Sequence, residues 1–167
     1  MKASWTVALP DAFISRLQSQ LGNAPTPQEK INVLNRLGLA YRHVDKNITQ
    51  DYAQQAHDLA AKHNYTRGTA EALVNFAFVC QSEGKPEQSL AYALKAINLA
   101  RQHDFPLALA DGLDILAINQ YDAGNYTDAR ENLTEATQIC ETIGDALLLF
   151  YVLNDISINH ACSGDLD

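Results

Sequence analysis

A repeat of 40 residues is the feature of this 167-residue sequence that most restricts its fold. Displacing the sequence by 40 positions aligns several landmark residues with residues of the same type further along the chain. The aligned sets are Leu73, Leu113 and Leu153; Gly84, Gly124 and Gly164; and Ala56, Ala96 and Ala136. A period of about 20–50 residues is typical of solenoids, in which each unit buries its apolar face against the neighbouring unit.

Each repeat contains two helical patterns. The first has apolar residues at positions i, i+3 and i+7 and a small residue at i+4, as in Leu34, Leu37, Gly38 and Tyr41. The second carries small residues along one face, and its members are Thr49, Ala53, Ala56 and Ala60; Ser89, Ala93, Ala96 and Ala100; and Ala129, Leu133, Ala136 and Cys140. Small side chains at these spacings let a neighbouring helix approach closely. Each repeat is therefore predicted to be a pair of packed helices.

The first repeat is expected to begin at a helix-capping sequence. Thr26 and Glu29 form a capping box, and Pro27 suits the first helical turn because its missing N–H is not needed there. An apolar stripe of Phe13 and Leu17 lies upstream and predicts one more helix, which we interpret as an N-terminal cap within residues 1–25. The array is expected to span residues 26–167. It comprises three full repeats at about 27–65, 66–105 and 106–145, and a half repeat at 146–167.

These residues resemble the tetratricopeptide motif. The best local matches are Leu34, Leu37, Gly38 and Tyr41, and then Gly124, Tyr126, Ala129 and Ala136. No tryptophan begins a repeat, and the 40-residue period is similar to the variety found in kinesin light chains and bacterial signalling proteins. The resemblance implies an all-α, right-handed superhelical solenoid of antiparallel helix pairs with about eight helices. It also implies that the chain binds a protein or a peptide.

In this family the first helices of successive repeats line a concave groove, and their non-core faces contact the partner. The resemblance therefore implies a partner-binding set of amides, acids, aromatic residues and aliphatic residues. Its members are Asn32, Asn35, Arg42, Glu71, Val74, Asn75, Phe78, Gln81, Asp111, Asp114, Ile118, Tyr121, Tyr151, Asn154 and Asp155. Amides can satisfy the backbone of a bound peptide, while apolar pockets accept its side chains.

Three of these residues have a second interpretation. Asn75 resembles the asparagine that kinesin-light-chain-type repeats place before the packing pair, where a carboxamide can hold a peptide bond. It could instead be a solvated or locally capped helix residue. Phe78 and Tyr121 suggest an interaction patch, because they are aromatic residues on a stripe expected to face solvent. Their alternative role is packing between adjacent repeats.

The net charge of −8 is concentrated in the second part of the chain. Residues 104–167 contain one basic residue, Arg130, against twelve acidic residues. This excess argues against nucleic acid as a partner, since phosphates require the opposite charge. Asp111, Asp114, Asp122 and Asp155 could form an acidic trough for a basic partner, or they could belong to a solvated face that keeps the protein soluble.

The sequence contains no signature of catalysis. It has no Gly-x-x-x-x-Gly-Lys loop, no Gly-x-Ser-x-Gly turn and no His-Glu-x-x-His helix. The histidines are dispersed, and His160 with Cys162 is an isolated pair. We therefore expect no enzymatic activity, no metal and no cofactor.

The composition also suggests where the protein acts. Scattered cysteines without a Cys-x-x-Cys pair, no secretion signal and no stretch long enough to span a membrane predict a cytoplasmic location and no membrane partner.

The fourth repeat is expected to lack its second helix, so the chain would be a fragment of a longer protein. The apolar residues Leu149, Leu153 and Ile156 would then be uncovered, which predicts a homodimer through the C-terminal helix. Two functions remain open. The chain is either the N-terminal sensory or docking part of a larger bacterial signalling protein, or a free-standing adaptor that scaffolds a complex.

Overall fold

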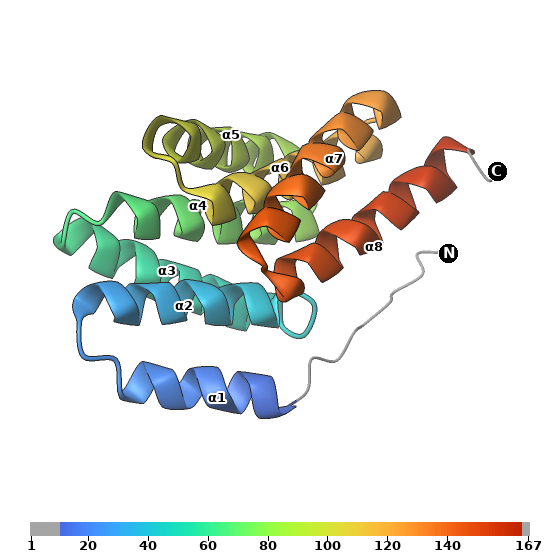
Figure 1. Ribbon diagram of the computed structural model, residues 1–167. Helices are drawn as coiled ribbons and strands as arrows, with labels where there is room; N and C mark the ends of the chain where they lie inside the picture. The colour runs from blue at the N-terminus through green and yellow to red at the C-terminus, as the bar shows by residue number, and fades with distance from the viewer. Residues whose placement is uncertain (1–10, 165–167) are drawn as a thin grey trace.

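The computed structural model describes residues 11–164, which form eight α-helices and no strand. Figure 1 shows antiparallel helix pairs stacked side by side into a curved array, so the predicted all-α solenoid of about eight helices is confirmed. Residues 1–10 and 165–167, which we assigned to the cap and the half repeat, lie outside the described residues. The helices are α1 (Asp11–Gly22), α2 (Pro27–Tyr41), α3 (Lys46–Lys62), α4 (Thr66–Ser82), α5 (Pro86–His103), α6 (Pro106–Asp122), α7 (Tyr126–Ile143) and α8 (Ala146–Ser163).

The start of α2 confirms Thr26 as the predicted capping residue. The side chain of Thr26 accepts a hydrogen bond from the backbone N–H of Glu29 at 3.2 Å and donates one to Oε2 of Glu29 at 2.9 Å. Pro27 occupies the first turn of the helix. Together these contacts satisfy a backbone donor that the helix leaves unpaired and fix where the first repeat begins.

The turns follow the same 40-residue period as the helices. Gly84 and Gly124, with φ angles of 71° and 84°, separate the two helices of the second and third repeats. A second left-handed position follows each outer helix, at Asn64, Asp104 and Gly144 with φ angles of 51°, 57° and 70°. Glycine and Asn or Asp are the residues that tolerate this conformation best, so the turns are encoded locally.

Small residues allow the helices to pack closely, as the sequence predicted. Ala56, Ala96 and Ala136, which occupy the same position in α3, α5 and α7, are fully buried. Gly38 in α2 is also required to be small, because a Cβ atom there would lie 2.8 Å from the Nδ2 atom of Asn75 in α4. The contact between the first two repeats therefore depends on a residue without a side chain.

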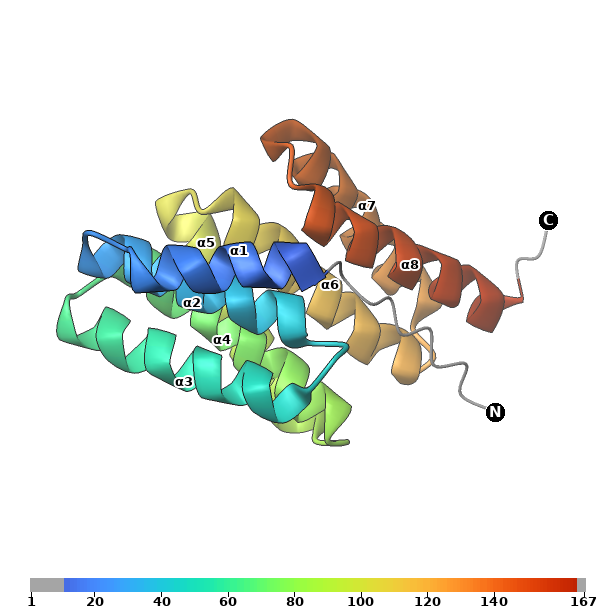
Figure 2. The same ribbon diagram turned by 90° about the horizontal axis from the view of Figure 1, so that it is seen from below.

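The first helices of the repeats form the inner layer of the solenoid. Helices α2, α4, α6 and α8 pack against one another in succession, whereas α3, α5 and α7 each pack between two of them. Helix α1 packs on α2 and lies along it in Figure 2. Among residues 11–164, no helix is both long enough and apolar enough to cross a membrane.

Replacing Ala96 by leucine should destabilise the fold by about 1–3 kcal/mol, because the fully buried contact of α5 has no room for a larger side chain. The matched control is Ala91→Leu, since Ala91 is exposed on the same helix and should change stability by less than about 0.5 kcal/mol. Urea unfolding followed by circular dichroism measures both. Equal unfolding midpoints for the two variants would contradict the assigned helix register.

Candidate functional site

A pocket of about 350 Å³ opens on the concave side of the solenoid. Its walls come from α1, α2, α4 and α6, and from the residue that precedes α8. The lining residues are Leu17, Gln20, Asn32, Val33, Asn35, Arg36, Leu39, Arg67, Glu71, Asn75, Leu107, Asp111 and Asp145. Elements from all four repeats and the N-terminal helix therefore meet at one cavity.

Five residues of the predicted partner-binding set line this pocket: Asn32, Asn35, Glu71, Asn75 and Asp111. The other members of the predicted set lie outside the pocket. Most of them are buried, whereas Gln81, Tyr121 and Asn154 are half-buried. The buried ones are Arg42, Val74, Phe78, Asp114, Ile118, Tyr151 and Asp155. The expectation that the whole set faces solvent is therefore wrong, because the inner helices pack tightly enough to bury most of these side chains against one another.

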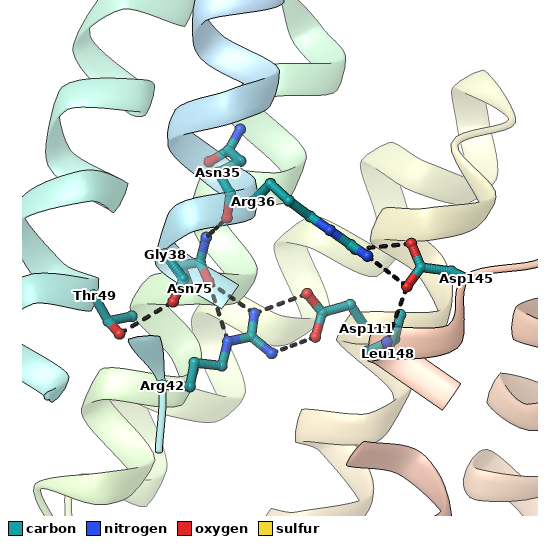
Figure 3. Close-up of polar contacts among 9 residues, drawn as sticks. All are labelled: Asn35, Arg36, Gly38, Arg42, Thr49, Asn75, Asp111, Asp145 and Leu148. Atoms are coloured by element: carbon teal, nitrogen blue, oxygen red, sulfur yellow. Dashed lines mark hydrogen bonds and ion pairs between the residues drawn. The ribbon is translucent and has the colours of Figure 1, made fainter. Parts of the chain in front are cut away.

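Arg42, at the C-terminus of α2, is the centre of a buried polar network (Figure 3). Its Nε and Nη2 atoms donate to Oδ1 of Asn75 at 3.1 and 2.9 Å, and its Nη1 and Nη2 atoms donate to the carboxylate of Asp111. The Nδ2 atom of Asn75 donates to the backbone carbonyl of Asn35 at 3.1 Å. Arg42 thus links α2 to α4 and α6, and the amide of Asn75 is used within the chain.

Phe78 packs beneath this network. It is 7% exposed, its ring lies 5.4 Å from the Cζ atom of Arg42, and the ring of His43 meets it edge-on at 5.2 Å. This is the alternative role that the sequence left open, namely packing between repeats. Tyr121 is half-buried and packs against the same apolar cluster.

A second ion pair connects the first repeat to the fourth. Nη1 of Arg36 in α2 lies 2.8 Å from Oδ2 of Asp145, and Nη2 donates to Oδ1 of Asp145 at 2.9 Å. Asp145 also caps α8, because Oδ1 accepts from the backbone N–H of Leu148 at 2.9 Å. The pair therefore joins the pocket wall to the start of α8, as Figure 3 shows.

The remaining charged residues of the pocket form a pair on α4. Nε of Arg67 donates to Oε1 of Glu71 at 2.9 Å. Burial raises the pKa of the Glu71 carboxyl, although the hydrogen bond from Arg67 opposes this shift. The sequence could have indicated the pair, since Arg67 and Glu71 are four residues apart on one helix.

Two carboxyls lie deeper, between α6 and α8. Asp114 is 2% exposed, and its Oδ1 atom has no hydrogen-bond partner. Burial, reinforced by the nearby carboxylate of Asp155, raises the pKa of Asp114 well above its usual range. Burial also raises the pKa of Asp155 to about 7. The interpretation of the acids as a solvated face is therefore wrong for Asp111, Asp114 and Asp155, which are buried, whereas Asp122 is exposed.

The pocket combines apolar and amide side chains. Leu17, Val33, Leu39 and Leu107 provide an apolar wall, and the amide side chains of Asn32 and Asn35 line the same cavity. An amide can both donate and accept hydrogen bonds. The sequence did not indicate Leu17 or Leu107 as contacts, because α1 and the far end of the pocket are brought together only by tertiary packing.

Residues 11–164 contain no group of three or more His, Cys, Asp or Glu side chains placed to hold a metal ion. The Cys140 thiol is buried, and burial raises its pKa to about 12, so it stays protonated near neutral pH and is a poor nucleophile.

No protein-family model matches the chain, and no curated protein matches it in sequence. Solved structures do match its fold. A Rap protein in complex with competence and sporulation factor superposes with a TM-score of 0.71 and 19% identity, over 91% of this chain and 44% of that chain. Aspartyl phosphate phosphatase F from Bacillus subtilis superposes with a TM-score of 0.63 and 20% identity, over 93% of this chain and 41% of that chain. BtubC from P. vanneervenii superposes with a TM-score of 0.57 and 15% identity, over 91% of this chain and 63% of that chain.

These likenesses establish a tetratricopeptide-like helical repeat fold. The chain spans less than half the length of the Rap protein and of the phosphatase that it matches. At such low identity the match defines the fold alone, and the same fold carries a ligand complex in one neighbour and a phosphatase in another.

Replacing Arg42 by alanine should destabilise the protein by about 3–5 kcal/mol, because the buried carboxylate of Asp111 would lose its countercharge. The control is Arg101→Ala, which breaks the exposed pair with Glu135 and should cost no more than about 1 kcal/mol. Chemical denaturation measures both variants. A loss for Arg42→Ala no larger than that for Arg101→Ala would mean that the network does not hold the repeats together.

Proposed function

We propose that this chain binds a segment of a protein or peptide partner in the concave pocket, and that it acts by binding without catalysing a reaction. The observation that carries the proposal is the combination of an apolar wall with the amide side chains of Asn32 and Asn35 in one concave pocket. A peptide supplies both complements, since its backbone donates N–H groups and its side chains can cover the apolar wall. The neighbouring Rap structure, which carries a bound factor, supports binding as a use of this fold.

We further propose that the partner is basic at the contact. Each arginine at the pocket is already paired with a carboxylate: Arg36 with Asp145, Arg67 with Glu71, and Arg42 with Asp111. An acidic peptide would have to displace one of these carboxylates. A partner with Lys or Arg side chains instead meets a chain with a net charge of −8, which favours its approach.

The biological setting that fits best is the sensory or docking part of a larger, cytoplasmic signalling protein built from the 40-residue variety of repeat. The match to less than half of the longer Rap structure supports this setting. A free-standing adaptor remains the alternative, and the sequence of the complete gene distinguishes the two.

Peptides selected from a random dodecapeptide library on the immobilised protein should be rich in Lys or Arg. They should bind a Val33→Arg, Leu107→Arg variant at least about tenfold more weakly, because two cations would occupy the pocket wall. The control is Leu90→Arg with Leu94→Arg on the exposed face of α5, which should bind normally. Isothermal titration calorimetry measures the affinities.

Undiminished binding by the pocket variant would refute the assigned site. Selected peptides that bind the pocket but are not rich in basic residues would refute only the basic partner.

We also propose that α8 mediates self-association. Phe150 and Leu153 are 41% and 47% exposed, while Leu149 and Ile156 of the predicted stripe are half-buried. The helix contains no lysine, arginine or glutamate, and its one aspartate, Asp155, is buried, so two copies can meet there without repulsion. Burial of each large apolar side chain contributes about 1.5–3 kcal/mol.

Light scattering at high protein concentration should therefore detect a dimer that persists in moderate salt. Phe150→Glu with Leu153→Glu should be monomeric, because the contact would bury four like charges. The matched control, Leu90→Glu with Leu94→Glu on α5, should still dimerise. A monomeric wild type, or a dimeric α8 variant, would exclude this interface.

A further inference from the structure

We propose that Asp114 and Asp155 form a pH-sensitive joint, in which ionisation of these two buried carboxyls loosens α8 from α6 and so regulates the concave pocket. The joint itself is independent of what the pocket binds. Only its consequence at the pocket rests on the function proposed above.

The two carboxyls lie on opposite sides of a helix contact. Asp114 belongs to α6 and Asp155 to α8, and these helices pack directly against each other. Both side chains are buried, at 2% and 7% exposure, and one oxygen of Asp114 has no hydrogen-bond partner. Two ionised carboxylates at this position would repel each other across the contact with little water to screen them.

Among the described residues, the cation that acts on both carboxyls is already engaged elsewhere. Arg42 favours their ionised forms, but its guanidinium holds Asp111 and Asn75. The other groups that act on the pair are acidic or neutral, namely Asp111, Tyr121 and Asp122 from α6 and Cys140 from α7. The next groups outward are Glu71 of α4, which acts on Asp111, Cys162 of α8, which acts on Tyr121, and His43, which packs on Tyr151.

The direction of the pH effect follows from burial. The pKa of Asp155 is raised to about 7 from an ordinary value of 3.8, and the pKa of Asp114 is raised as well. The docked state therefore holds its proton more tightly than the open state. Docking is strongest at low pH and weakens as the pH rises from about 4 through about 7.

His43 does not sense this range. The residue as a whole is exposed, yet its ring contacts the rings of Phe78 and Tyr151. Burial, with the charge of Arg42, lowers its pKa to about 4, so His43 is neutral throughout the range in which Asp155 loses its proton.

The joint is connected to the pocket through the start of α8. Asp145 lines the pocket, pairs with Arg36 of α2 and caps α8. A displacement of α8 therefore moves or releases Asp145, which opens the pocket wall and frees a cation. At lower pH the helix is docked and the wall is closed.

Hydrogen–deuterium exchange of residues 146–163 at pH 6 and pH 8 tests the joint directly. For a single carboxyl with these two pKa values, linkage predicts that the equilibrium for opening increases about tenfold over this interval. Protection of α8, corrected for intrinsic exchange, should fall by that factor in the wild type. In the double variant Asp114→Asn, Asp155→Asn, the protection of α8 should be the same at the two pH values.

Two control variants should retain the pH dependence. His160→Gln removes the histidine of the same helix, and Asp128→Asn removes an exposed acid of α7. Carboxyl carbon NMR of the wild type provides a measurement that does not depend on any variant folding. Asp155 should titrate near pH 7.

Several results would overturn the proposal: a wild type whose α8 protection is equal at the two pH values, a double variant that keeps the dependence, or an Asp155 that titrates near pH 4.

Failure to select any peptide would count against the proposed function alone, since exchange of α8 reports the joint without a ligand. If peptides are selected, their affinity should change between pH 6 and pH 8 in the wild type and not in the double variant. Equal affinities in the wild type would separate the joint from the pocket.

Discussion

The buried guanidinium of Arg42 is the interaction on which the arrangement of the repeats depends. It joins the end of α2 to Asn75 in the second repeat and to Asp111 in the third. A buried charge is costly to desolvate, so this pair adds less to stability than an apolar contact of the same size would. Its contribution is geometric, because the planar donor array of arginine is satisfied at only one relative position of the three helices. We interpret the network as the element that fixes the curvature of the solenoid.

That curvature decides which part of the concave face remains open. Near Arg42 the inner helices are close enough to bury Phe78, Asp114 and Tyr151. Towards α1 the walls separate, and the pocket lies there with its apolar side and its amide side chains. The ion pair between Arg36 and Asp145 closes the far side of the opening. The position of α8 and the shape of the pocket are thus connected through a few charged groups.

Most of the fold, but only part of the site, could be predicted from the sequence. The sequence indicated the helix pairs, the capping residue Thr26 and the small residue Gly38 at a close helix contact. It identified the inner helix faces, yet it left open whether Phe78 contacts a partner or packs between repeats, because periodicity does not reveal how closely the next repeat approaches. It could not indicate that Leu17 of α1 and Asp145 before α8 line the same pocket, since they are brought together only by the stacking of four repeats.

The sequence by itself determined the local structure. Helix periodicity, capping residues and left-handed turn positions at Gly84 and Gly124 act within a few residues of one another, so they repeat wherever the motif repeats. The tertiary structure decided the protonation and the exposure of the acids. Whether Asp114 and Asp155 are solvated or buried depends on the distance between α6 and α8, which are separated in sequence by a whole helix. Their pKa values follow from that burial, because desolvation and mutual repulsion exist only once the two helices have packed.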